Sequence, residues 1–280
     1  MRKWLYRTAV AALGLSLLAG CGTSVQDTAE GQSLKVVSNK VLLEIVPEQI
    51  KVEYKNDDST LLLGEFISVM PKLQAEEADG AAQEIADRFN RRMQADLKKS
   101  QKEWDRYMDE DRDVILALSS DEAEYVHWCR HSAYDVTRVG MLASFRFEEY
   151  NFLGGAHGFT EYTTALFDME QGEFVAVNAM TDRPKELSQA IGKDILRQIQ
   201  EEDRATVYGY WEEYPDYVMT HVDSGVKNTG IAFENDRNLE IVFPAYELAS
   251  YAAGPQEFLV GSEVWEPYLN GYGQQLLGIS

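Results

Sequence analysis

The sequence predicts an α+β protein made of two closely packed lobes, each with a mainly antiparallel sheet and a long amphipathic helix. Segments rich in Val, Ile and aromatic residues alternate with turn residues along most of the chain, which is typical of antiparallel strands. Two other segments repeat apolar residues at helical spacing. The middle of the chain has no Pro- or Gly-rich linker, so we expect the lobes to pack together.

Residues 1–20 have the features of a bacterial lipoprotein signal peptide and are left out of the fold. A basic N-terminus precedes an apolar stretch that is too short to span a bilayer. The stretch ends in Leu-Ala-Gly before Cys21, which resembles a lipobox. We expect Cys21 to be lipidated and residues 21–33 to form a polar tether, giving an extracytoplasmic, lipid-anchored envelope protein. The alternative is a secretory signal with a chance cysteine.

The charge of the chain limits its partners. The formal net charge is −21, which repels phosphate backbones and anionic headgroups. Nucleic acid is therefore not an expected partner, whereas a basic protein would be attracted. No cofactor is expected.

The first lobe is expected over residues 34–150. Strands are predicted at Leu34–Val46, Gln49–Tyr54 and Thr60–Met70, the last of them closed by Pro71. A long helix, roughly Glu77–Met108, follows, because its apolar residues recur at helical spacing across an otherwise charged segment. The stripe comprises Ala82, Ile85, Phe89, Met93, Leu97 and Trp104.

The rest of this lobe is expected to return to strands. The acidic run Asp109–Asp113 lacks the glycine and ligand spacing of a calcium loop, so a solvated loop is expected. Successive strands are then predicted at Ala123–Arg130, Ala133–Val139 and Met141–Tyr150, with Gly140 between the last two.

The second lobe is expected over residues 151–280. A helix is predicted from Pro184 to near Asp203. The aromatic-rich segment Val207–Val222 has no clear assignment. Strands are predicted in two hairpins, Thr163–Phe167 with Phe174–Val177 and Thr229–Glu234 with Leu239–Phe243, and then at Glu257–Val260 before a short helix at Val264–Tyr268.

Three candidate metal ligands alternate along one predicted strand. His127, Cys129 and His131 would share a face, with neighbours about 7 Å apart at a rise of roughly 3.3 Å per residue. Three ligands from one strand give poor tetrahedral geometry for zinc. We therefore favour a partly covered strand face over a metal site, although metal binding stays open.

The segment Gly154–Gly158 is the most unusual connection in the chain. It joins two predicted strands and holds three glycines and His157. Glycine permits positive φ and close backbone approach. The segment is therefore either a demanding turn or a backbone-lined site with one titratable side chain.

This loop and a later tail resemble a known family. Asn151–Gly158 and Leu239–Gly254 are similar to two hallmarks of an extracytoplasmic domain of unknown function found in the anti-sigma factor RsiV and the peptidoglycan deacetylase PdaC. Leu153 replaces an aromatic or polar loop residue, and Ala245 is inserted before Tyr246. The segment Met70–Asn90 resembles the companion N-terminal domain, so the likeness extends over most of the chain from Leu34.

The resemblance implies two α+β lobes outside the cytoplasm and a binding or sensing role. In RsiV this region binds lysozyme, so a cationic protein of that kind or a cell-wall glycan is the expected ligand, while the membrane is reached through the lipid. The candidate binding residues are Gly154, Gly155, His157 and Gly158 in the loop, and Tyr246, Tyr251 and Gly254 in the tail.

An envelope hydrolase is the alternative. His157 could act as a general base beside backbone N–H donors on peptidoglycan or another polysaccharide. The sequence has no Gly-x-Ser-x-Gly motif. Glu148 and Glu149 are adjacent on a predicted strand and therefore face opposite sides, which does not suit a glycosidase pair. Binding is favoured over catalysis, and no catalytic residue is assigned.

Overall fold

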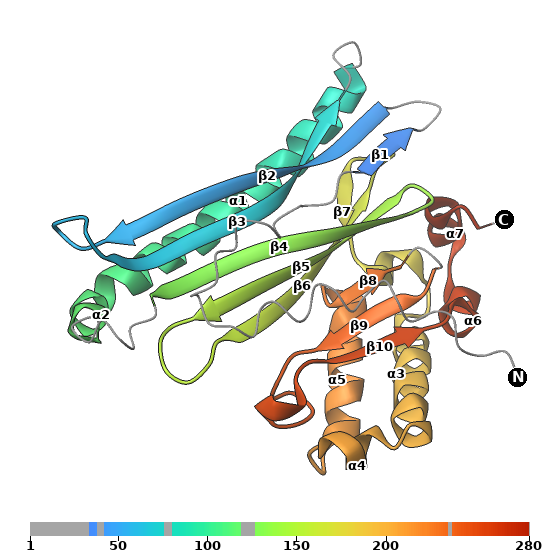
Figure 1. Ribbon diagram of the computed structural model, residues 1–280. Coiled ribbons are helices and arrows are strands. Elements are labelled where there is room, and N and C mark those ends of the chain that lie inside the picture. Colours follow the sequence, from blue (N-terminus) through green and yellow to red (C-terminus); the bar gives the residue numbers. More distant parts are fainter. Residues whose placement is uncertain (1–33, 38–41, 76–79, 119–126, 235–236, 280) are drawn as a thin grey trace, which may run out of the picture.

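The computed structural model describes residues 34–37, 42–75, 80–118, 127–234 and 237–279. Cys21, the signal peptide and the tether lie outside them. The described chain forms a seven-stranded sheet in the order β1-β2-β3-β4-β5-β6-β7 and a three-stranded sheet in the order β10-β9-β8 (Figure 1). Only β3 and β4 pair in parallel within these described sheets. The predicted α+β class is confirmed.

The second and third strands are longer than expected. After β1 (Leu34–Val37), β2 runs from Leu42 to Lys55 and β3 from Leu62 to Ala75. Both strands continue through a proline, and Pro47 lies opposite Pro71 in the register. The predicted strand ends at Val46 and at Met70 were wrong: β2 and β3 continue past them, because the two missing N–H groups fall at one rung of the ladder.

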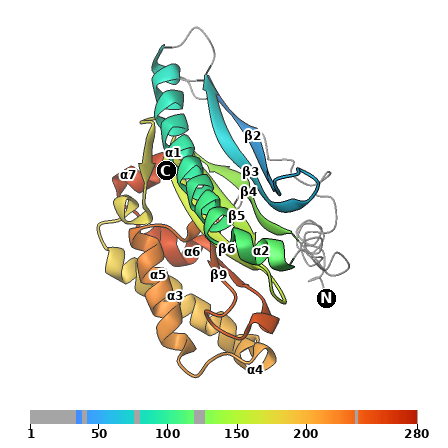
Figure 2. The ribbon, with the colours of Figure 1, turned by 90° about the vertical axis from the view of Figure 1, so that its left-hand side faces the viewer.

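The long helix is α1 (Gly80–Glu110), and it covers one face of the large sheet (Figure 2). Its buried side chains include the whole predicted stripe. Phe89 is the centre of this contact: its ring lies 5.3 Å from Phe145, 5.0 Å from Phe167 and 5.5 Å from Phe174, between ring centroids.

The acidic run after α1 is helical, so the predicted solvated loop was wrong. α1 continues to Glu110, and α2 occupies Arg112–Leu118. The Asp111 N–H donates to Tyr107 O, and the Ile115 N–H donates to Asp111 O, which carries the helical pattern across the junction. Burial of Ile115 gives α2 its packing contact.

The next strands form one unbroken antiparallel set. β4 (Trp128–Val139) is a single strand where two were predicted, and it pairs with β5 (Leu142–Phe152) along nearly its whole length. β6 (Phe159–Asp168) follows, and β7 (Glu173–Val175) pairs only with its last residues. The large sheet therefore contains strands from both sides of residue 150.

The second lobe packs two helices against the small sheet. After η1 (Val177–Met180), α3 (Pro184–Glu201) and α5 (Tyr214–Lys227) lie side by side, joined through α4 (Arg204–Tyr208). The segment without an assignment is thus mostly helical, and its proline lies in the first turn of α5, where a missing N–H costs no helical bond.

The small sheet and the C-terminus complete this lobe. The strands are β8 (Ile231–Phe233), β9 (Leu239–Phe243) and β10 (Gln256–Val260), and η2 occupies Tyr251–Ala253. They are followed by α6 (Ser262–Trp265), η3 (Glu266–Tyr268) and α7 (Gly271–Leu277). Within the described part of the chain, no helix is both long and apolar enough to cross a membrane.

Polar contacts join the two sheets. The Arg146 guanidinium of β5 lies 2.6 Å from Glu240 Oε1 of β9 and 3.0 Å from Asp135 Oδ2. The Phe233 N–H of β8 donates to Ser144 Oγ at 2.7 Å. These contacts fix β8 and β9 against the sheet face opposite α1.

Candidate functional site

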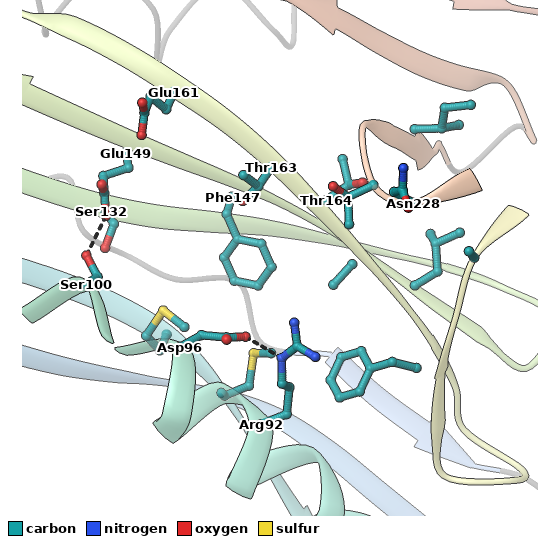
Figure 3. A pocket seen from close by; sticks show the side chains of 18 of the residues that line it. Arg92, Asp96, Ser100, Ser132, Phe147, Glu149, Glu161, Thr163, Thr164 and Asn228 are labelled. Carbon is teal, nitrogen blue, oxygen red and sulfur yellow. Dashed lines mark hydrogen bonds and ion pairs between the residues drawn. The ribbon is translucent and has the colours of Figure 1, made fainter. Parts of the chain in front are cut away.

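A cavity of about 540 Å³ opens between α1 and the sheet, at the side of β6. Figure 3 shows Arg92, Asp96 and Ser100 of α1 facing side chains from β4, β5 and β6. Asn228, at the end of α5, lies at the other end of the lining. β3 and β5 supply alternate residues because side chains alternate between the faces of a sheet, whereas β6 supplies the consecutive residues 163–166.

Acidic groups dominate the charge of this cavity. Asp96 is paired with Arg92 at 2.7 Å. Glu149 accepts from Ser100 Oγ at 2.9 Å and lies 3.3 Å from Nε of the buried Arg130. Glu161 lies opposite Glu149 in the register. Among the described residues that line the cavity, no arginine or lysine pairs with it.

The pKa of Glu161 is raised at this position. Desolvation raises the pKa of its carboxyl, and the charge of Glu149 raises it further, although Arg130 opposes the shift. A raised carboxyl pKa means that the site disfavours further negative charge. A cationic group entering the cavity would relieve that cost.

The predicted loop and tail residues lie together at the far end of β6. The His157 ring stacks on Tyr251 with 3.7 Å between centroids and 14° between planes. The Tyr251 hydroxyl donates to Gly158 O at 2.9 Å, and the ring centroids of Tyr246 and Tyr251 are 5.6 Å apart. The two hallmarks therefore form one surface cluster, which we call the loop–tail cluster (His157, Gly158, Tyr246 and Tyr251).

The glycines allow this geometry. Gly154, Gly155 and Gly254 have φ of 82°, 89° and 70°, in the region that favours glycine. A Cβ on Gly158 would lie 2.5 Å from the Asn151 carbonyl oxygen. The loop thus needs small residues for its own conformation, and a binding role for its glycines stays a prediction.

His157 is placed poorly for general base catalysis. Its Nδ1 lies 3.1 Å from Gly158 O, its ring is covered on one side by Tyr251, and it does not line the 540 Å³ cavity. The hydrolase hypothesis therefore gains no support from this geometry.

The two histidines among the candidate metal ligands lie beside a carboxylate. Glu65 Oε1 lies 2.7 Å from His131 Nε2 and 3.5 Å from His127 Nε2. Cys129 is fully buried. Over the described ranges, no group of three His, Cys, Asp or Glu residues has the arrangement of a metal site.

Sequence reasoning missed the acidic cavity. Its residues come from α1, β5 and β6, and no motif joins them. One signal was available: on the face of β5 that meets α1, the run Ala143, Phe145 and Phe147 ends in the acidic Glu149. A charge that interrupts a buried face indicates a solvent-filled space or a partner charge.

A protein family and two solved structures match this chain, and the first of the structures supports its fold. A family described as "Protein of unknown function (DUF3298)" matches residues 176–262. A DUF3298 family structure from Bacteroides fragilis NCTC 9343 is similar at 14% identity and a TM-score of 0.60, covering 85% of this chain and 98% of that chain. A second, from Pseudomonas aeruginosa PAO1, has 11% identity and a TM-score of 0.47, with coverage of 85% and 96%. No curated protein matches the chain.

Proposed function

We propose that this protein, which contains a DUF3298 domain at residues 176–262, is a lipid-anchored, extracytoplasmic binding protein of the cell envelope. Its proposed ligand is a cationic protein such as lysozyme. The observation that carries the proposal is the cavity beside β6, where the carboxylates of Asp96, Glu149 and Glu161 outnumber the single lining arginine, Arg92.

Two further observations support recognition of a basic surface. The chain carries a formal net charge of −21, which would steer a cationic protein toward it. Exposed aromatic side chains also lie near the loop–tail cluster: Phe159 is 41% exposed, Trp211 is 40% exposed and Tyr246 is 57% exposed. Exposed aromatic residues commonly supply the contact area of protein interfaces.

Calorimetry with lysozyme tests the proposal. We expect the mature, full-length protein to bind lysozyme at low salt, with an affinity that falls as salt rises. Glu161→Gln should weaken binding about 5-fold, because it removes a charge that has no cation of its own in the cavity. Glu84→Gln, the same charge change on the exposed side of α1, is the matched control and should bind as the unchanged protein does.

Two results would decide against a cationic protein. Binding of cell-wall glycan fragments without binding of lysozyme would assign the site to glycans. Binding of neither ligand at low salt would end the proposal. An equal effect of the two Gln variants would show only a general charge effect and would remove the cavity from the binding site.

The lipid anchor is tested separately in the native host. Labelling with radioactive palmitate should mark the protein, and Cys21→Ser should abolish the label. Labelling of the Cys21→Ser protein, or an unlabelled unmodified protein, would contradict the anchor.

A further inference from the structure

One edge of β6 is open for most of its length. β6 pairs with β5 from Phe159 to Asp168. On its other side, β7 pairs only with Leu166–Asp168 (Figure 1). No other described strand pairs with this side, so the backbone of residues 159–165 is unpaired there, although the Gly230 N–H donates to Thr164 Oγ1 at 2.7 Å. Such an edge is a ready template for another strand.

The hydrogen bonds at the end of β6 show which of its backbone groups face outward. The Gly172 N–H donates to Asp168 O, so the Asp168 backbone points toward β7. The Met169 N–H donates to Met141 O on the β5 side. Since the direction alternates along an antiparallel strand, the N–H and C=O groups of Thr160, Tyr162 and Thr164 point out at the open edge.

Hollows lie on both faces of the sheet beside this edge. The 540 Å³ cavity is lined by both Thr163 and Thr164, which are neighbours on opposite faces, so the cavity passes around the edge of the strand. A smaller hollow of about 40 Å³ on the other side is lined by Tyr162, Thr164 and Glu240. A strand added here would direct alternate side chains into the two hollows.

The charges beside the edge favour a basic occupant. Glu149 and Glu161 lie on the α1 side, while Glu240 lines the smaller hollow together with Arg146, which lies 2.6 Å from its carboxylate. Glu148 also lies on that second side, where burial, Asp135 and Glu257 raise the pKa of its carboxyl against the opposing effect of Arg146. A second copy of this acidic chain would bring carboxylates against carboxylates, so it fits poorly.

We propose that the open edge of β6 binds an extended, basic segment of a partner protein as an additional strand of the large sheet. Backbone hydrogen bonds to Thr160, Tyr162 and Thr164 supply the pairing, and lysine or arginine side chains reach the carboxylates on the two faces. The inference rests on the proposed function, since it gives the manner in which a cationic protein is recognised.

Hydrogen exchange tests the pairing directly. The probe is a synthetic peptide that alternates lysine and valine, and the control is a peptide that alternates glutamate and valine. We expect only the basic peptide to bind, and we expect it to slow exchange of the Thr160, Tyr162 and Thr164 amides at least tenfold. The Thr163 and Ala165 amides point toward β5 and are the internal reference. Binding without protection of the three outward amides, or no binding of the basic peptide, would overturn the inference.

A proline substitution tests the same edge with lysozyme. Tyr162→Pro removes an outward N–H, whereas Tyr162→Ala removes the same side chain and keeps the N–H. We expect Tyr162→Pro to bind at least tenfold more weakly than Tyr162→Ala, with thermal unfolding used to check that both variants fold. If Tyr162→Pro is unfolded, the hydrogen-exchange experiment on the unchanged protein still tests whether a strand is added at this edge.

The outcomes separate the two proposals. Equal binding of lysozyme by folded Tyr162→Pro and Tyr162→Ala would overturn strand addition and leave the binding function standing. Failure of lysozyme to bind the unchanged protein, together with edge protection by the basic peptide, would remove lysozyme as the ligand and support the edge.

Discussion

Glu65 of β3 is a buried carboxylate that lies beside His131 of β4 and His127, the residue before β4. Its exposed fraction is 8%, and the nearby His127 and His131 hold the pKa of its carboxyl well below the usual range, against the opposing effect of burial. A carboxyl with a lowered pKa in the folded state adds stability that is present above the unfolded pKa and lost as pH falls. The cluster therefore contributes to stability at neutral pH.

We predict that Glu65→Gln lowers the free energy of unfolding by about 1–3 kcal/mol at pH 7, because it weakens a charged hydrogen bond. The difference from the unchanged protein should shrink as pH falls below about 4.5, the usual pKa of glutamate, since the unfolded chain then takes up a proton at Glu65 that the folded protein does not. Urea unfolding between pH 7 and pH 3 measures it. A difference that grows in acid would contradict this assignment.

Gly140 is a second residue whose backbone conformation and close neighbours leave no room for a side chain. It has φ of 60° in the β4–β5 turn, and a Cβ there would lie 2.5 Å from the Leu276 carbonyl oxygen of α7. The neighbouring Met141 N–H donates to that same oxygen at 2.8 Å. The backbone of the turn therefore packs directly against the backbone of the C-terminal helix.

We predict that Gly140→Ala destabilises the fold by about 2–3 kcal/mol, from overpacking and from positive φ. Gly271→Ala is the control, because a Cβ at that position meets nothing within 4 Å. It should change stability by less than about 1 kcal/mol. Thermal unfolding of both variants compares them, and equal losses would show that the contact with α7 does not matter.

At the scale of elements, α1 is held by a narrow apolar stripe. Phe89 is fully buried among three other phenylalanines, whereas Arg91, two residues later, is exposed. Removing a large core side chain costs both burial and a cavity. The helix should therefore depend strongly on one face and hardly at all on the other.

We predict that Phe89→Ala lowers the free energy of unfolding by about 3–5 kcal/mol. Arg91→Ala should stay within about 0.5 kcal/mol of the unchanged protein. Chemical denaturation followed by circular dichroism measures both. A loss below about 1 kcal/mol for Phe89→Ala would mean that the sheet repacks around the gap.

Sequence periodicity predicted α1 and the start of α3 well, because these helices carry regular apolar stripes. It divided β4 into two strands and took the Asp109–Asp113 run as a loop, because hydrogen bonding to neighbouring segments overrides local composition. The resemblance singled out the loop and the tail, and the contact between them is a finding of the structure. The acidic cavity was not predicted, since its residues meet only through strand register, and register is not visible in the pattern of one strand.

At the scale of the whole molecule, the Arg146 cluster connects the two sheets. Arg146 bridges Asp135 in the large sheet and Glu240 in the small one. The acidic neighbours raise the pKa of Arg146 despite its burial. Removing one member would leave a buried charge without its partner, which costs more than the pair itself contributes.

We predict that Arg146→Met destabilises the protein by about 3 kcal/mol, and that adding Glu240→Leu recovers much of this loss. The physical reason is that the double variant leaves no unpaired charge at Glu240. Chemical denaturation of the two single variants and the double variant gives the coupling energy. Additive losses would show that the two side chains act independently.

The parallel contact between β3 and β4 affects how the molecule folds. The other neighbouring strands of the large sheet are joined by short connections, but Ala75 and Trp128 are separated by α1 and α2. Closing so long a connection costs chain entropy before any pairing compensates for it. We therefore expect the hairpin of β2 and β3 and the set β4–β6 to form first from local contacts, and the two to pair only after α1 has formed. The helix that lines one side of the acidic cavity is thus also the connection that allows β3 and β4 to pair in parallel.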